Sequence, residues 1–274
     1  MYRCFVGHLA VFDKILFQTL TKNDDMSIID IMSNLTRKER EFLQREARIL
    51  QIAHEFVMRE GYHGLSMDRI ADSIEYSKGT IYNHFRNKEE IIAALAVQTI
   101  FHRVDLFRRA VQFSGCARER MQAIGVAAEL FAKLYPHHSL YQQVLRMPSI
   151  WEKTSAQRQA QFESAESQCV NTVANVVRDG IAEGNLSLPE GFNPEDLVFG
   201  LWSLTSAAFT LAASNSNLGR LGIASPFGSV RVLTSRMIDG FNWRPLSSEL
   251  DFDQVAERAI RELFLEEFTK LEAG

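Results

Sequence analysis

Apolar residues recur along most of this chain with the spacing of an amphipathic helix. Within 45–60 they occupy positions i, i+3, i+4, i+7 and i+8, and a similar stripe runs through 121–135. Side chains at these spacings share one face of a helix, so both segments are predicted to be helices with a buried face. Almost every other segment follows the same period. The pattern therefore predicts an all-α fold.

Further helices are predicted in the C-terminal half of the chain. Asn193-Pro194-Glu195-Asp196 is a strong start signal, because it combines a capping side chain, a proline at the first helical position and acids in the first turn. The final helix has one apolar and one charged face, so it requires a surface to pack against. The predicted helices cover 140–145, 149–184, 193–213, 229–241 and 253–271.

The predicted helix 193–213 is unusual because no charged residue occurs from Leu197 to Gly219. It could be a membrane span or a buried helix. The strongly apolar part stops near Ala213, short of the roughly 20 residues that a span requires. We therefore predict a buried helix and no membrane association. Small residues on it would let another helix approach closely, as at a dimer interface: Gly200, Ala207, Ala208 and Ala212.

Residues 66–88 predict two short helices separated by a three-residue break, which is the layout of a DNA-reading helix-turn-helix. The hydroxyl of Ser66 can cap the first helix and that of Ser77 the second. Ile81 and Phe85, four residues apart, give the second helix a buried stripe. Its other face carries hydrogen-bond donors and flat rings suited to phosphates and base edges: Lys78, Gly79, Thr80, Tyr82, Asn83 and His84.

Over these residues the chain resembles the tetracycline-repressor (TetR) family of bacterial transcription regulators. The resemblance begins near Arg45, passes through Gly61-Tyr62-His63-Gly64, and is most specific from Lys78 to Ile91. It implies that the helix 78–84 enters the major groove, with Lys78 at a base edge and Lys88 on the backbone. It also implies that Thr80, Tyr82 and His84 hold phosphates. The DNA-binding set is Ser66, Ser77, Lys78, Gly79, Thr80, Tyr82, Asn83, His84 and Lys88.

One position departs from the family pattern. The family often has glycine in the turn where this chain has Glu75. If this residue adopts a left-handed backbone, a side chain there costs about 1 kcal/mol. We interpret the turn as tolerated rather than ideal.

These observations divide the chain into three parts. Residues 36–103 are predicted to form the helix-turn-helix domain and residues 104–274 a helical ligand-binding and dimerisation domain, with the helix from Lys88 toward Phe113 as connector. Residues 1–35 are an N-terminal extension. This extension is a short docked helix, a disordered segment, or a misassigned start with Met26 as the true first residue.

Composition and charge are compatible with an intracellular DNA-binding protein. The chain has 274 residues, of which 46% are hydrophobic, and a net charge of −4. The acidic excess lies mainly in the C-terminal part, so local basic residues decide phosphate binding. Three cysteines without paired spacing predict neither a disulfide framework nor a zinc site, and the N-terminus lacks a signal peptide, which predicts a cytoplasmic location. The basic residues before and within the reading unit are Arg37, Lys38, Arg40, Lys78, Arg86 and Lys88.

The sequence contains no recognisable catalytic motif, and we predict neither an enzyme nor a bound cofactor. His137 and His138 are adjacent, so their rings leave a helix in different directions and are poorly placed to share a metal. The leading hypothesis is a ligand-responsive repressor. The alternatives are a DNA-binding scaffold of the same fold that recruits a protein partner, as in nucleoid occlusion, and an enzyme with an accessory DNA-binding domain.

The family resemblance also implies a homodimer on a palindromic operator and an effector pocket among the central helices. Helices 193–213 and 229–241 would form the dimer interface. Aromatic walls with few charges suit an apolar or planar small molecule. The residues predicted to line the pocket are Phe131, Tyr135, Tyr141, Trp151, Phe162, Trp202 and Phe209.

Overall fold

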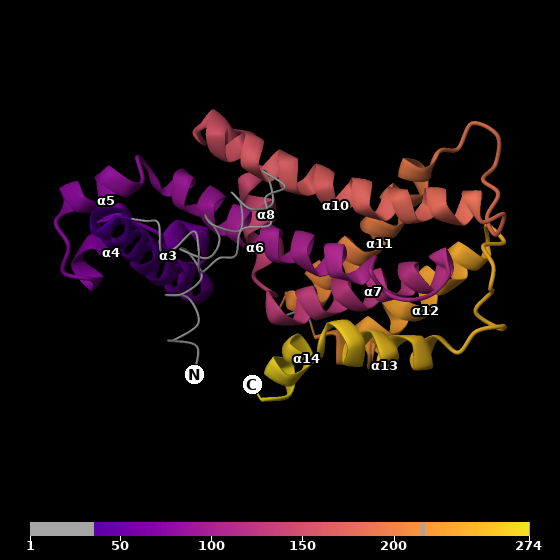
Figure 1. Cartoon of the computed structure of the whole chain (residues 1–274). Coiled ribbons are helices and arrows are strands. Elements are labelled where there is room, and N and C mark those ends of the chain that lie inside the picture. Colours follow the sequence, from indigo (N-terminus) through magenta and orange to yellow (C-terminus); the bar gives the residue numbers. More distant parts are fainter. Residues whose placement is uncertain (1–35, 215–216, 274) are drawn as a thin grey trace. The chain divides into compact units, whose positions relative to one another are not determined.

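The computed structural model describes residues 36–214 and 217–273, and every regular element within those ranges is a helix (Figure 1). The predicted all-α fold is confirmed. The proposed N-terminal extension, 1–35, lies outside the described residues. The chain forms two compact units. Unit 1 comprises the residues up to Phe101 together with Tyr141–Glu163, and unit 2 comprises His102–Leu140 and the residues from Ser164 onward.

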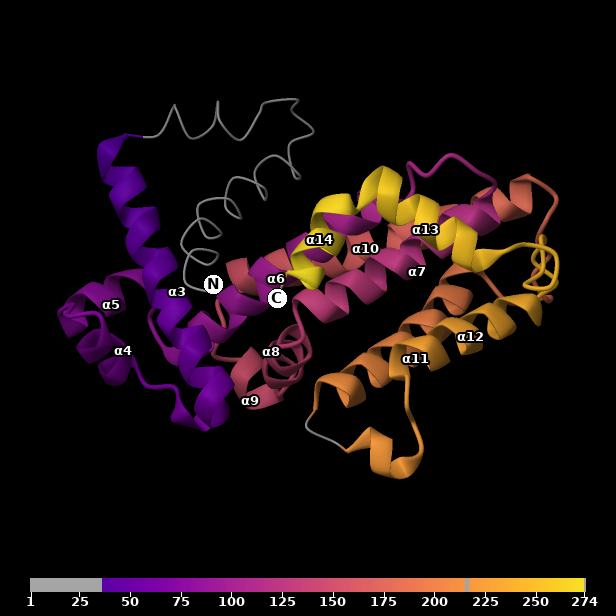
Figure 2. The ribbon, with the colours of Figure 1, turned by 90° about the horizontal axis from the view of Figure 1, so that it is seen from below.

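The longest helix of unit 1 is α3 (Arg37–Gly64), which is kinked at Gly61, where φ is 71°. The short helix α4 (Met67–Ser73) packs against α3, and α5 (Lys78–His84) packs against α4 (Figure 2). Their buried residues include Ile49, Ala53, Ile70, Ile81 and Phe85. The remaining helices of unit 1 are the first part of α6 (Lys88–Ala110), the end of α8 (His138–Leu145), α9 (Pro148–Trp151) and the start of α10 (Ala156–Ala182).

The helix starts in unit 1 follow from local capping. Thr36 and Glu39 form a reciprocal capping box that begins α3. The side chain of Asn87 accepts a hydrogen bond from the Glu90 N–H (2.8 Å) and so caps α6. Ser77 caps α5 as predicted, whereas the capping hydrogen bond expected at Ser66 is not formed, although Ser66 occupies the N-cap position of α4.

The predicted helix 149–184 is broken in the structure. It consists of α9 (Pro148–Trp151) and α10 (Ala156–Ala182), joined by a corner at 152–155. Ser155 begins α10, since its Oγ accepts a hydrogen bond from the Arg158 N–H at 3.4 Å. The four residues of the corner, 152–155, are all polar, so the apolar pattern has a gap where the helix breaks.

Unit 2 contains two groups of packed helices. α13 (Phe252–Leu263) and α14 (Leu265–Glu272) lie along α7 (Ala117–Leu134), and α11 (Pro194–Ala213) lies beside α12 (Pro226–Asp239) (Figures 1 and 2). The rest of α6 and α10 and a 3-10 turn, η2 (Leu218–Leu221), complete the unit.

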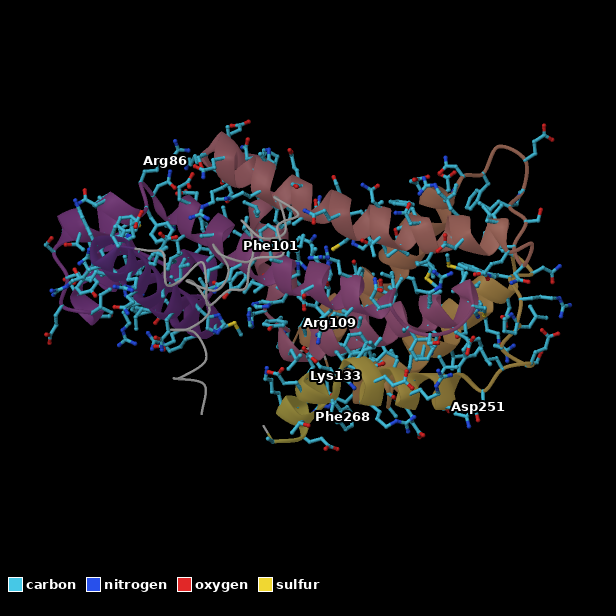
Figure 3. All side chains as sticks on the ribbon, viewed as in Figure 1. Arg86, Phe101, Arg109, Lys133, Asp251 and Phe268 are labelled. Carbon is cyan, nitrogen blue, oxygen red and sulfur yellow. The ribbon has the colours of Figure 1, made fainter. Side chains whose placement is uncertain are left out.

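The predicted helix 253–271 is also interrupted, at Phe264, where the backbone leaves the helical region and the side chain is fully buried. Arg109 of α6, labelled in Figure 3, contacts this bend. Its guanidinium lies over the Phe264 ring at 5.2 Å, donates to the Leu263 carbonyl at 3.1 Å and pairs with Glu267. Arg109 therefore links the C-terminal helices to α6, in addition to the packing of these helices along α7.

Helix α11 differs from the prediction because it is not buried within the chain. Only Leu197 and Val198 are buried, and Phe199 and Leu211 are 65% and 53% exposed. It is the one helix of the described residues long and apolar enough to cross a membrane, but a single such helix is a weak indication of a span. Gly200 accommodates Met237 of α12, since an added Cβ would lie 2.6 Å from the Met237 methyl carbon. Gly200 therefore allows α11 and α12 of the same chain to pack closely.

An aromatic and histidine cluster occupies one end of unit 2. The His102 ring stacks on Tyr135 with centroids 4.7 Å apart and planes within 5°, and Phe131 contacts both Tyr135 and His138. Arg103 lies 5.7 Å from the Phe131 ring. Burial, and to a lesser extent the charge of Lys270, lowers the pKa of His102 to about 4. The imidazole is therefore neutral at pH 7 in the folded protein.

This depressed pKa predicts a loss of stability in mild acid. Below pH 6.5 the unfolded chain protonates His102, whereas the folded chain does so only near pH 4, so protons favour unfolding between these values. We expect roughly 2 kcal/mol less free energy of unfolding at pH 5 than at pH 7 from this residue. Denaturant titrations of wild type and His102→Gln measure it. The exposed His63→Gln is the control. An unchanged pH dependence in His102→Gln would contradict the assignment.

Candidate nucleic-acid interface

The turn between α4 and α5 is closed by two backbone hydrogen bonds to the Ala71 carbonyl, from Ile74 (3.3 Å) and Tyr76 (3.1 Å). Glu75 sits between them with φ at 57°, in the left-handed region. Glu75 was expected to be strained if its backbone were left-handed, and the structure shows that it is. The strain of about 1 kcal/mol is carried by an exposed side chain that packs against nothing essential.

The start of α5 is fixed by its serine cap. Ser77 Oγ accepts a hydrogen bond from the Thr80 N–H at 3.1 Å, and the hydroxyls of the two residues lie 2.8 Å apart. Because Thr80 Oγ1 contacts this cap, its hydroxyl is oriented before any ligand arrives. The cap also leaves the residues after it, Lys78 and Gly79, at the exposed beginning of the helix.

The exposed face of α5 carries the predicted contact residues. Ile81 and Phe85 point into the core, while Lys78, Gly79, Tyr82 and Asn83 are exposed. Tyr82 is 52% exposed, which is high for a ring of that size. An added Cβ at Gly79 would meet only the Ser77 hydroxyl, at 3.7 Å. Packing within the chain therefore does not require a glycine there, whereas close approach by an outside surface does.

Lys78 is already paired in the free protein. Its Nζ lies 2.8 Å from Asp68 Oδ2 of α4, and this hydrogen-bonded carboxylate raises the pKa of Lys78. Both side chains are more than half exposed, so the ion pair contributes little stability. Asp68 lies in the first turn of α4. The pair connects the two helices through the residue expected to read a base.

His84, at the end of α5, is half-buried against α3. Its ring contacts the Phe42 ring, with centroids 4.0 Å apart and planes tilted by 31°. Burial lowers the pKa of His84, with a weaker opposing effect from Glu46 and a further lowering effect from Arg45. A neutral imidazole can donate one hydrogen bond to a phosphate but brings no charge to it.

Lys88, in the first turn of α6, lies over the Tyr62 ring with Nζ 4.3 Å from its centroid. The Tyr62 hydroxyl donates to Glu89 Oε1 at 3.0 Å, and burial together with Glu89 raises the pKa of Tyr62. Lys153 also approaches Glu89, at 3.5 Å. Lys88 is thus oriented by a ring from the end of α3.

The segment joining α5 to α6 is anchored to the corner before α10, which sequence reasoning missed. Arg86 and the Asn87 amide both donate to the Lys153 carbonyl, at 2.8 and 3.2 Å (Figure 3 marks Arg86). Glu90 accepts hydrogen bonds from the N–H and the hydroxyl of Ser155. All these residues belong to unit 1. More than sixty positions separate the partners, so no local sequence signal could reveal them.

The residues predicted to line an effector pocket are divided between the units. Tyr141, Trp151 and Phe162 belong to unit 1, where Tyr141 and Phe162 are buried and the Tyr141 hydroxyl hydrogen-bonds to His54 Nδ1. The other four belong to unit 2, so neither unit contains the whole set: Phe131, Tyr135, Trp202 and Phe209. Among the described residues, no group of three His, Cys, Asp or Glu side chains is placed to hold a metal ion.

Comparison with known proteins agrees with this interface. The family model for bacterial regulatory proteins of the tetR family matches residues 49–95, which include α4, the turn and α5. The HTH-type transcriptional activator FasR of Mycolicibacterium smegmatis is 29% identical over 135 residues, covering 49% of this chain and 59% of FasR. UidR of Escherichia coli is 37% identical over 65 residues, covering 24% of this chain and 33% of UidR. The chain thus spans less than two thirds of either relative.

A longer match is the fatty acid metabolism regulator protein of Bacillus subtilis, 24% identical over 182 residues, covering 62% of this chain and 90% of that protein. Solved structures share the fold. A tetR-family regulatory protein of Rhodococcus RHA1 has a TM-score of 0.57 at 16% identity, covering 72% of this chain and 97% of its own. FadR of B. subtilis in complex with stearoyl-CoA has a TM-score of 0.54 at 16% identity, covering 70% and 97%.

The family model and the curated relatives fall on the helix-turn-helix, and the solved structures reproduce the helical arrangement that carries it. The relatives are named as transcription regulators and not as enzymes. Residues 49–95 thus form a DNA-binding domain of the kind found in the TetR family of transcriptional regulators.

Proposed function

We propose that this protein is a sequence-specific DNA-binding repressor, which acts in the cytoplasm as a homodimer and is released from a palindromic operator by an apolar or planar small molecule. The observation that carries the proposal is the exposed face of α5. It offers Lys78, Tyr82 and Asn83 beside a glycine that packing within the chain does not require, and it lies within the family match. A helix of this kind, exposed on one side and packed on the other, suits insertion into the major groove.

The dimer proposal rests on an apolar surface that this chain leaves uncovered. Exposed positions at i, i+4, i+8 and i+12 of α11 are Phe199, Ser203, Ala207 and Leu211. Val232 and Leu233 of the adjacent α12 are 60% and 53% exposed. Apolar surface gathered on two neighbouring helices is typical of a subunit interface. A two-fold dimer would also present two copies of α5 to the half-sites of a palindrome.

The effector proposal rests on the aromatic residues of unit 2 and on one relative. Trp202 and Phe209 lie half-buried on α11, which has no charged residue after Asp196, and Phe209 also contacts Phe227. Apolar walls of this kind suit a ligand with little charge on its buried part. Within that class, the name of the fatty acid metabolism regulator of B. subtilis favours a long acyl chain.

The reading role predicts different consequences for different residues of α5. Tyr82→Ala should weaken binding to every DNA sequence, because it removes a phosphate contact, whereas Lys78→Ala should relax the preference at one base position by about 1 to 3 kcal/mol. Bound sequences are first selected from genomic DNA, and the variants are then titrated against matched and mismatched operators. Arg59→Ala, off this face, is the control. Full affinity in Tyr82→Ala would overturn the docking model, and equal loss on all sequences would make Lys78 a phosphate contact.

The proposed dimer surface predicts that an acid placed on it separates the subunits. Ala207→Asp buries an unpaired carboxylate at the interface, so we expect monomers in analytical ultracentrifugation and at least about a tenfold loss of operator affinity. Ala160→Asp, on the exposed side of α10, makes the same chemical change elsewhere. A dimer that survives Ala207→Asp at micromolar concentration places the interface elsewhere.

The effector proposal predicts that stearoyl-CoA lowers operator affinity of the wild type. A ligand changes DNA affinity only through its different affinity for the two protein states, so the shift measures that difference directly. Trp202→Ala should blunt the response while binding of DNA without ligand survives. Operator titrations use stearoyl-CoA, free stearate and free coenzyme A. Release by coenzyme A alone, or only by metal ions or charged metabolites, would refute an apolar ligand.

A further inference from the structure

We propose that the first three turns of α3 form a second phosphate-binding element beside the end of α5, with Lys38 and Arg45 as its cations. This inference rests on the proposed DNA-binding function. It concerns residues that precede the family match, which begins at position 49. None of the residues predicted from the family resemblance to contact DNA lies there.

The position of the element is given by one aromatic contact. The Phe42 ring of α3 contacts the ring of His84, the last residue of α5, with ring centroids 4.0 Å apart and planes tilted by 31°. Lys38 and Arg45 lie four residues before and three residues after Phe42, so the three side chains share one side of the helix. Arg45 is also close enough to His84 to affect its pKa. The cations therefore flank the end of the reading helix.

The acids that could neutralise these cations are engaged elsewhere. Glu39 forms the capping box with Thr36, and Glu41 pairs with Arg37 at 2.8 Å. Glu46, the neighbour of Arg45, lies 3.4 Å from Arg158 of α10. Each carboxylate on this part of α3 thus has its own partner.

Most other cations of unit 1 do have partners. Arg59 and Arg69 share Glu60, Lys78 pairs with Asp68, and Arg86 pairs with Glu90. Within the described residues, no ion pair involves Lys38, Arg40 or Arg45. Unpaired cations gathered on one segment create a local positive potential that attracts a polyanion. Under the proposed function, the polyanion next to this surface is the duplex DNA bound by α5.

Arg40 provides an internal comparison. It is exposed and lacks an ion pair among the described residues, like Lys38, but it lies two residues from Phe42 and so projects from a different side of the helix. A general electrostatic effect would depend on all three cations alike. A phosphate contact beside α5 depends on Lys38 and Arg45.

The test is the salt dependence of DNA binding by the full chain. Each phosphate contact contributes about 0.9 to the slope of log affinity against log salt concentration, because it releases counterions from the duplex. Wild type, K38Q/R45Q and R40Q are titrated with the selected operator and with a random-sequence duplex between about 50 and 200 mM salt. Unfolding curves check that the substitutions leave stability unchanged.

We expect K38Q/R45Q to lower the slope by up to about 1.8 per protomer, and to weaken both duplexes about equally, because phosphate contacts carry no base information. R40Q should keep a slope close to that of wild type. A wild-type slope in K38Q/R45Q, or an equal decrease in R40Q, would overturn the second element while leaving the reading role of α5 intact. Failure of the wild type to bind either duplex would instead refute the proposed function.

Discussion

Two carboxylates buried in the first turn of α6 hold unit 1 together. Glu89 and Glu90 are each less than a tenth exposed. A buried charge is tolerated only when hydrogen bonds and opposite charges replace the lost water. Glu89 accepts a hydrogen bond from the Tyr62 hydroxyl of α3. Glu90 accepts hydrogen bonds from the backbone N–H and the hydroxyl of Ser155. The start of α6, where backbone N–H groups point outward, is also the favourable end for negative charge.

Together with a contact of Tyr141, these hydrogen bonds connect the segment 141–163 to α3 and to the residues that follow α5. The corner at Lys153 and Ser155 is held by the residues that directly follow the reading helix, while Tyr141 is buried and bonded to His54 of α3. A ligand that displaced the start of α10 would therefore act on the α5–α6 junction through hydrogen bonds. Such a change alters DNA affinity only to the extent that the ligand prefers one arrangement.

The sequence predicts those features of this fold that depend on neighbouring residues. Ser77 and Asn193 are capping residues with short-range partners, and the spacing of Ile81 and Phe85 determines the buried side of α5. The left-handed turn at Glu75 could likewise be anticipated, because it is a property of one residue in one turn. Such local rules are enough to predict where helices form and which face of α5 is exposed.

Features that depend on distant partners were not predictable in this way. At the corner before α10 Ser155 hydrogen-bonds to Glu90, and at the bend Arg109 contacts Phe264; neither long-range contact has a local sequence signal. The exposure of α11 was predicted wrongly, since an uncharged helix has the same composition whether it is buried in its own chain or left for another surface. The pattern of apolar residues shows that a helix has an apolar surface, but it does not show which other surface packs against it.

The ion pair between Lys78 and Asp68 has a consequence for how the protein would search a chromosome. A lysine that already has a carboxylate partner adds little to the attraction toward an arbitrary stretch of duplex. If Lys78 reads a base as proposed, it would leave Asp68 only where a base edge offers better acceptors. The ion pair would thus shorten the residence time on wrong sequences more than on the right one, and faster departure from wrong sites means that more positions are sampled in a given time.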